Sequence, residues 1–152
     1  MAEKSLTKVM IRKQMNMSEW VYNGEPLIEP GEYYGFVYII ENLLSGRKYI
    51  GKKFFWSTKR KQVNKKRKTI KVESDWKTYW SSSDELKADV AALGEQNFKR
   101  TIIHLCPSKG VTNYLEAKEQ MSHAVLEDSD KWYNSWIQCK VNKSHLRPLR
   151  KG

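Results

Sequence analysis

The sequence predicts an α/β domain in which a small, mostly antiparallel three-stranded sheet is flanked by helices, in the order β-β-α-β-α-α. Three observations predict this class. The chain has 152 residues, a length that suits one compact domain. Hydrophobic residues make up 39% of it and aromatic residues 12%, which is typical of a folding chain. Runs rich in β-branched and aromatic residues alternate with stretches of helical periodicity.

The domain is expected to occupy residues 32–140. Residues 1–31 are interpreted as a lead-in of mixed charge, which prolines and a glycine separate from the domain and which packs onto it. Its hydrophobic anchor is predicted to be the run from Trp20 to Tyr22. Residues 141–152 are expected to form a basic C-terminal tail.

A β-hairpin is predicted near the start of the domain. Its strands run from Tyr33 to Glu41 and from Lys48 to Gly51, because these segments are dense in β-branched and aromatic residues and enclose turn residues. If residues 43–44 form a two-residue loop, Tyr38 lies directly opposite Tyr49 on one face of the hairpin.

The remaining elements follow in chain order. Ser82 to Glu85 has the spacing of a capping box and begins a helix that Gly94 ends. Phe98 to Cys106 is the third predicted strand. Val111 to Leu126 is the second predicted helix, since its apolar residues fall on one face at 100° per residue. A short aromatic segment, Trp132 to Ile137, stands last in the order before the tail.

The net charge of +11 is concentrated in residues 52–75, a long excursion between the hairpin and the first helix. Its basic residues, with no acid among them as far as residue 71, are Lys52, Lys53, Lys59, Arg60, Lys61, Lys65, Lys66, Arg67, Lys68 and Lys71. Burying unpaired ammonium groups is prohibitive, so the excursion is expected to be exposed. We predict that the residues from Lys59 onward bind nucleic acid through its phosphates. The simpler alternative is a solvated loop.

Some classes of protein are not expected. The two cysteines, Cys106 and Cys139, have no partner at metal-ligand spacing, which argues against a zinc site or a disulfide framework and favours a reducing cytoplasm. The sequence has no long apolar stretch and no apolar signal core at its N-terminus, so we expect neither a membrane span nor a secretion signal.

Two motifs resemble the halves of the signature of GIY-YIG nucleases. Phe36-Val37-Tyr38 is followed, after ten intervening residues, by Tyr49-Ile50-Gly51, although Phe and Val replace the Gly and Ile of the first half. A helical carboxylate in Tyr114-Leu115-Glu116 and an asparagine in Tyr133-Asn134 follow in the family's order. The resemblance covers roughly Tyr34 to Trp136, and its wider pattern is similar to a bacteriophage-encoded, homing-endonuclease-like branch.

The resemblance implies a metal-dependent DNA endonuclease that hydrolyses phosphodiester bonds. It implies that Tyr38 is the general base and that Tyr49 orients the water or the phosphate. A tyrosine with a pKa near 10 needs roughly 3 to 4 kcal/mol of phenolate stabilisation to act as a base at neutral pH. Lys52 or Lys53 could supply part of it, and Arg60 is the candidate phosphate clamp.

By the same resemblance, Glu116 holds one divalent cation, Mg²⁺ by default or Mn²⁺, and Asn134 orients the substrate. Glu119 is the alternative metal ligand, although it lies almost opposite the apolar stripe of its helix. Simpler interpretations also exist: Glu116 could belong to a helix cap with Asn113, and Asn134 could be an ordinary turn amide.

Three further points stay open in the sequence. His104 is interpreted as a strand histidine, and His123 is a reserve candidate for an acid near the leaving group. The competing function is a non-catalytic basic protein that binds nucleic acid with a degenerate nuclease core. One active site predicts single-strand nicks, so a double-strand break would require a dimer or two successive cleavage events by a monomer.

Overall fold

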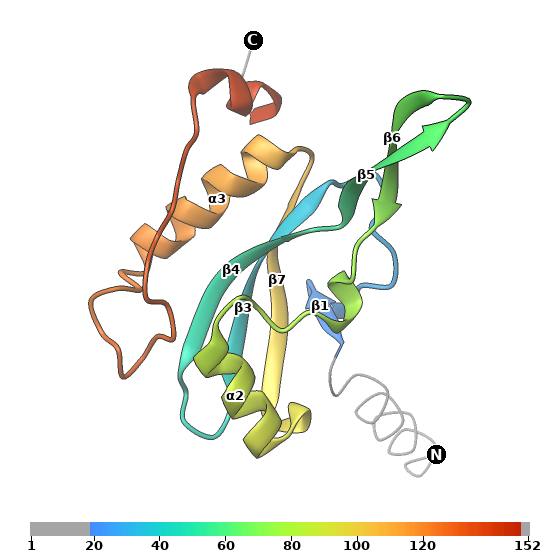
Figure 1. Ribbon diagram of the computed structural model, residues 1–152. Helices are drawn as coiled ribbons and strands as arrows, with labels where there is room; N and C mark the ends of the chain where they lie inside the picture. The colour runs from blue at the N-terminus through green and yellow to red at the C-terminus, as the bar shows by residue number, and fades with distance from the viewer. Residues whose placement is uncertain (1–18, 150–152) are drawn as a thin grey trace, which may run out of the picture.

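The computed structural model describes residues 19–149. Most of the predicted lead-in (1–18) and the end of the predicted tail (150–152) lie outside the described residues. Two helices, α2 (Asp84–Leu93) and α3 (Lys109–Ser122), cover opposite faces of one β-sheet (Figure 1). The mixed α/β class is therefore confirmed.

The sheet has five strands in the order β2-β1-β7-β3-β4 rather than the three predicted. Their bounds are β1 Trp20–Tyr22, β2 Glu25–Pro26, β3 Gly35–Asn42, β4 Lys48–Phe54 and β7 Phe98–Cys106. The strands β7, β3 and β4 form the antiparallel part of the sheet, and β7 has the bounds that the sequence predicted. The sheet is mixed because β1, from the predicted lead-in, pairs in parallel with β7.

The register of the β3–β4 hairpin differs from the predicted one by two residues. Tyr38 pairs with Gly51, and Tyr49 pairs with the residue two positions beyond Tyr38. The prediction was wrong because the loop is longer than two residues: the Asn42 side chain accepts hydrogen bonds from two loop N–H groups at 3.0 and 3.3 Å, and Gly46 adopts a φ of +77°. A shift of two keeps both tyrosines on the same face, as diagonal neighbours.

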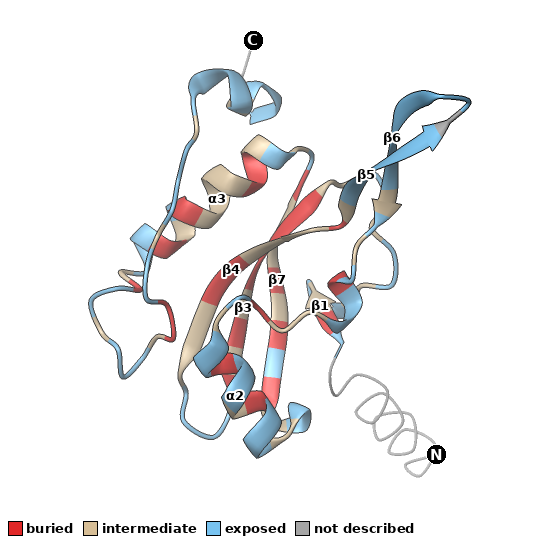
Figure 2. Ribbon diagram, viewed as in Figure 1, coloured by how far each residue is buried: buried red, intermediate tan, exposed pale blue. Residues whose placement is uncertain are grey.

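Each face of the sheet has its own hydrophobic core, and Figure 2 shows the buried residues running along the central strands. One core contains Trp20, Phe36 and Tyr38 under α2, and the other contains Val37 and Ile50 under α3. Alternation along β3 and β4 places neighbouring residues in different cores. Around the edge strand β4, side chains from both faces can meet.

The basic excursion forms a second, two-stranded sheet that projects from the body (Figure 1). Strands β5 (Trp56–Val63) and β6 (Lys66–Glu73) are antiparallel. Asn64 and Lys65 between them both have positive φ, at 51° and 62°, as a two-residue type I′ turn requires. The predicted excursion is thus an ordered hairpin.

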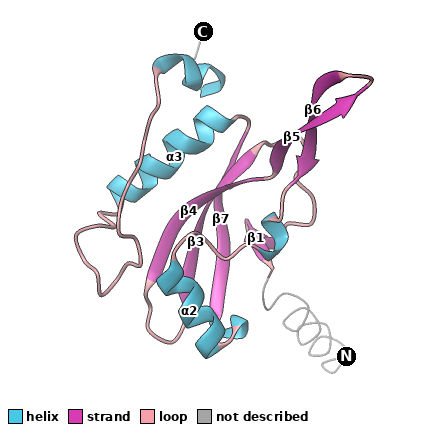
Figure 3. Cartoon of the chain, viewed as in Figure 1, coloured by secondary structure: helices cyan, strands magenta, loops and turns pink. Residues whose placement is uncertain are grey.

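Both α-helices begin at a serine. Ser83, not Ser82, caps α2 by accepting a hydrogen bond from the backbone N–H three residues on, at 3.2 Å. Ser108 caps α3 in the same way, which excludes the alternative interpretation of a helix cap at Asn113. The segment 132–137 is not helical (Figure 3); a 3-10 helix, η3 (Lys143–Leu149), follows it instead.

Two further expectations concern the described residues alone. Cys106 is buried, Cys139 is exposed, and both are free. Within residues 19–149, no helix has the length and apolar character needed to cross a membrane.

Candidate active site

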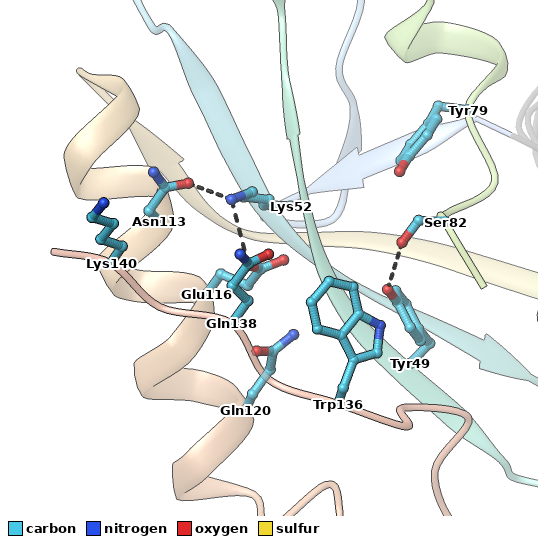
Figure 4. A pocket seen from close by; sticks show the side chains of 10 residues that line it. All are labelled: Tyr49, Lys52, Tyr79, Ser82, Asn113, Glu116, Gln120, Trp136, Gln138 and Lys140. Carbon is cyan, nitrogen blue, oxygen red and sulfur yellow. Dashed lines mark hydrogen bonds and ion pairs between the residues drawn. The ribbon is translucent and has the colours of Figure 1, made fainter.

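An open cavity of about 480 Å³ lies at the edge strand β4 (Figure 4). Its walls come from β4, from the segment before α2, from α3 and from the chain after residue 135. The lining residues are Tyr49, Lys52, Tyr79, Ser82, Asn113, Glu116, Gln120, Trp136, Gln138 and Lys140. Because the cavity surrounds an edge, it collects polar groups from both faces of the sheet.

The first wall carries tyrosines. The hydroxyl of Tyr49 lies 3.1 Å from that of Ser82, which is free for this contact because Ser83 caps the helix. Tyr38 lies beneath, fully buried, with its ring centroid 6.2 Å from those of both Tyr49 and Tyr79. Its ring meets that of Tyr79 nearly edge-on, at an interplanar angle of 82°. The two motif tyrosines therefore differ in position. Tyr49 lines the cavity, whereas Tyr38 packs against Tyr79, which also lines it.

Gly51 makes room for this arrangement. A Cβ atom at residue 51 would lie 2.5 Å from the hydroxyl oxygen of Tyr38 and 2.7 Å from the Tyr49 ring. Only a residue without a side chain allows the Tyr38 ring to lie across β4 at this point. The glycine of the second motif half thus has a steric role in the site.

Burial raises the pKa of all three phenols. The pKa of Tyr38 lies well above its usual value of 10, mainly because of desolvation, and the charges of neighbouring groups add to the effect. Desolvation also raises the pKa values of Tyr49 and Tyr79, although the hydrogen bonds to Ser82 oppose it. The tyrosines of the free protein are therefore neutral hydroxyls. A general base at Tyr38 would need a shift in the opposite direction.

The second wall carries a cation and a carboxylate. Lys52 Nζ lies 3.8 Å from Glu116 Oε1 and donates a hydrogen bond to the Asn113 side-chain oxygen. Desolvation raises the pKa of the Glu116 carboxyl, and Lys52 partly offsets this rise. Asn113 and Glu116 are three residues apart on α3, so both side chains lie on the face toward β4.

Gln120 lies one turn beyond Glu116 and lines the same cavity. Its Nε2 donates to the backbone carbonyl of Ile50 at 2.9 Å, whereas its buried Oε1 has no hydrogen-bond partner among the described residues. A buried acceptor without a donor is costly. Carboxylate and amide oxygens are ligands of hard divalent cations such as Mg²⁺. The donor set therefore fits the predicted metal, with Gln120 added to Glu116.

Glu119, the alternative metal ligand, lies outside the cavity. Its carboxylate contacts two histidines, His104 Nε2 at 2.8 Å and His123 Nδ1 at 3.4 Å. The histidine on β7 and the one at the end of α3 thus share Glu119 as a partner and do not line the cavity. Across residues 19–149, no cluster of three or more His, Cys, Asp or Glu side chains could hold a metal ion.

Three predicted site residues lie elsewhere. Asn134 is buried, and its amide pairs with both backbone groups of Ile50, accepting at 3.1 Å and donating at 2.8 Å. Lys53 forms an ion pair with Asp75 at 2.7 Å and lies 4.2 Å above the Tyr79 ring. Arg60 is exposed on the projecting hairpin and does not line the cavity, so the cavity gives no support to its predicted role as the phosphate clamp.

The third wall consists of residues that no sequence motif pointed to. Trp136, Gln138 and Lys140 lie at alternate positions of an extended segment, the period-2 signal of one face of a strand-like chain. Trp136 is 65% exposed, which is unusual for an aromatic side chain at a polar cavity. Asn134 and the pairing of Lys48 with the chain at residue 132 hold this segment against β4.

Arg100 fixes the segment that carries Tyr79. It is almost fully buried between the rings of Trp20 and Trp80, and it donates hydrogen bonds to the backbone carbonyls of Tyr79 (2.8 Å) and Lys77 (3.1 Å). Desolvation lowers the pKa of its guanidinium to about 10, so it stays charged at neutral pH. A buried arginine between aromatic rings thus fixes the backbone of the segment that carries Tyr79.

The comparisons with known proteins agree with this geometry. A family model described as "Putative endonuclease segE, GIY-YIG domain" matches residues 20–137, which is more than half of the chain. No curated protein matches the chain, and no solved structure does. The matched segment contains the sheet, both α-helices and the cavity walls as far as Trp136. The chain belongs to the GIY-YIG endonuclease family described by this model.

Proposed function

We propose that the protein is a metal-dependent DNA endonuclease that hydrolyses phosphodiester bonds at the cavity on β4. One observation carries the proposal: Tyr49, Lys52 and Glu116, from both sides of one edge strand, line a single polar cavity. Membership of a nuclease family supports the reaction class. The wider motif pattern adds the prediction of a bacteriophage homing-type role.

Lys52 is suited to hold the scissile phosphate. Its ammonium already contacts an amide oxygen and a carboxylate, so it is oriented before substrate arrives. A fixed positive charge stabilises the negative charge that builds on the phosphoryl oxygens in the transition state. In this proposal Lys52 takes the role that the sequence assigned to Arg60.

Tyr49 is suited to orient the attacking water. As a neutral hydroxyl with Ser82 at 3.1 Å, it can accept one hydrogen bond and donate another toward the cavity. Tyr38 acts one step further away, by packing its ring against that of Tyr79. The proposal therefore assigns the direct contact with water or phosphate to Tyr49 and a positioning role to Tyr38.

Glu116, with the free amide oxygen of Gln120, would hold Mg²⁺ or Mn²⁺. When bound, such a cation stabilises phosphoryl charge and lowers the pKa of a coordinated water. The two side chains lie on adjacent turns of α3, so the helix fixes their spacing. Hydrogen bonding of Gln120 to Ile50 further links this helix to the edge strand.

The decisive experiment is cleavage of supercoiled plasmid with Mg²⁺ or with EDTA. We expect nicking only with the metal, and a loss of at least about 100-fold on Glu116→Gln. Glu119→Gln is the matched control, because it removes a carboxylate from the same helix outside the cavity. A gel shift without cleavage under all conditions would instead identify a non-catalytic nucleic-acid-binding protein.

Two single substitutions test the different roles assigned to the two tyrosines. Tyr49→Phe removes the hydroxyl that lines the cavity, whereas Tyr38→Phe removes one that lies beneath it. We expect the larger loss of nicking rate for Tyr49→Phe. Equal rates for Tyr49→Phe and the wild type would refute a role for this hydroxyl. The same assay at rising protein concentration tests whether linear product requires a dimer.

A further inference from the structure

The projecting β5–β6 hairpin has two chemically different faces. Residues paired directly across the hairpin share a face, so the register sorts its side chains. One face carries Thr58, Arg60, Gln62, Arg67, Thr69 and Lys71. The other carries the lysines Lys59, Lys61, Lys66 and Lys68 with Ile70. The arginines and the glutamine are thus gathered on one side.

Both faces are exposed, and their basic residues form no ion pairs with described residues. The side chains just named are all exposed. No ion pair within the described part of the chain includes any of these basic residues. Lys61 lies directly opposite Lys68, a like-charge pair that destabilises a hairpin. The hairpin therefore has a surface complementary to a polyanion.

The chemistry of the first face is that of base recognition. Arginine binds guanine through two hydrogen bonds, glutamine binds adenine in the same way, and threonine contacts either base edges or the thymine methyl group. Arg60 pairs across the hairpin with Thr69, and Gln62 pairs with Arg67, so these side chains form one compact patch. Lysines make less directional contacts with phosphates.

The dimensions suit the major groove of duplex DNA. The two strands of a ribbon lie about 4.8 Å apart, and the major groove is about 12 Å wide, so it can admit a two-stranded ribbon. The base of the hairpin is fixed to the body: Ser74 donates hydrogen bonds to the backbone carbonyls of Phe55 (2.8 Å) and Phe54 (2.6 Å). Lys71 packs 4.5 Å from the Trp56 ring at the same end. The free end can therefore enter a groove while its base stays in place.

We propose that this hairpin is a duplex-DNA recognition arm, in which Arg60, Gln62 and Arg67 contact base edges in the major groove and the lysines of the opposite face extend to the flanking phosphates. The choice of DNA rests on the proposed function. The arm gives the protein sequence preference away from the cleavage cavity. Arg60 then contributes to specificity and not to the chemical step.

Selection from a randomised pool of DNA duplexes, in EDTA, tests the recognition face without cleavage. We expect the full-length protein to enrich a sequence motif. The double variant Arg60→Lys, Arg67→Lys keeps the charge but loses the planar fork, so it should lose preference by roughly tenfold at one or more base pairs. The control Lys59→Arg, Lys66→Arg on the other face should retain the motif. No wild-type motif, or an unchanged motif in the Arg→Lys variant, overturns the recognition role.

The lysine face is tested by salt dependence. Replacing its four lysines with glutamine should weaken binding to all duplexes and reduce the slope of log K against log salt by about 0.9 for each phosphate that is no longer neutralised. Tighter binding of single strands or of duplex RNA than of duplex DNA would overturn the choice of occupant. Circular dichroism of each variant shows whether the fold is intact.

The two proposals fail in distinguishable ways. If the hairpin is not a recognition arm, metal-dependent nicking of plasmid persists and is unaffected by its substitutions at saturating protein. If the cavity is not catalytic, the hairpin still selects its motif in EDTA. A Glu116→Gln protein that retains the wild-type motif separates recognition from cleavage directly.

Discussion

Replacing Asn134 with alanine tests whether this residue acts in structure or in chemistry. The substitution removes two buried hydrogen bonds to Ile50, with distances of 3.1 and 2.8 Å. The Ile50 carbonyl retains Gln120 as a donor, but the Ile50 N–H loses its partner. At about 1 kcal/mol for each hydrogen bond, and somewhat more for the orphaned N–H, we expect a loss of about 2–3 kcal/mol in the free energy of unfolding.

Urea and thermal denaturation measure this loss. For a chain of this size, 2–3 kcal/mol corresponds to a fall in Tm of about 4–12 °C. Gln138→Ala is the control, because Gln138 is an exposed side chain on the same extended segment. Wild-type stability of Asn134→Ala together with abolished nicking would refute the structural role and return Asn134 to the chemistry. Loss of stability with partial nicking supports a residue that holds the Trp136 segment in place.

Two other predictions test the cavity and its glycine. Burial raises the pKa of Glu116 from 4.5, so between 4.5 and the raised value the folded state holds a proton that the unfolded chain has lost. The stability that this group contributes is present below pH 4.5 and is lost as the pH rises through the pKa of the folded state. In thermal denaturation, Glu116→Gln should therefore raise the Tm at pH 7 but not at pH 4. Gly51→Ala should lower the free energy of unfolding, measured in urea, by about 1–3 kcal/mol, because the new Cβ meets the Tyr38 hydroxyl. A variant as stable as the wild type would contradict the steric role of Gly51.

Elements with local signals were predicted well. The strand Phe98–Cys106 has its predicted bounds, and the first helix ends before Gly94 as its pattern indicates. Such segments carry their periodicity and end signals within about ten residues. The hairpin register was wrong because it depends on one side chain, Asn42, that lengthens the loop.

Local residue patterns could not predict which segments pair when those segments lie far apart in the sequence. Three residues at Trp20–Tyr22 form a strand because β7, far along the chain, offers a parallel partner. The segment at residues 131–134 likewise runs along β4 through backbone and amide hydrogen bonds instead of forming a helix. Neither segment has a strand pattern long enough to predict its partner.

The site residues, too, were predictable where the signal is local and not where it depends on the tertiary fold. Glu116 was identified by a motif, and Gln120 and Asn113 share its helix face at spacings that a helical wheel shows. Tyr79 and Ser82 reach the cavity through the fold of an irregular segment, which no period describes. A count of residues along the chain could not show that the excursion folds on itself and carries Arg60 away from the cavity.

The altered first half of the signature bears on packing and not on the cavity. Phe36 and Val37 are both fully buried, one in each core, on β3 in the interior of the sheet. The cavity is built outward from β4 and receives no side chain from β3. Substitutions at these two positions therefore reach the cavity indirectly, by displacing Tyr38 in the first core or the helix α3 on the second core. The groups that the proposed reaction needs, Tyr49 above all, come from the intact second half and from the helix that faces it.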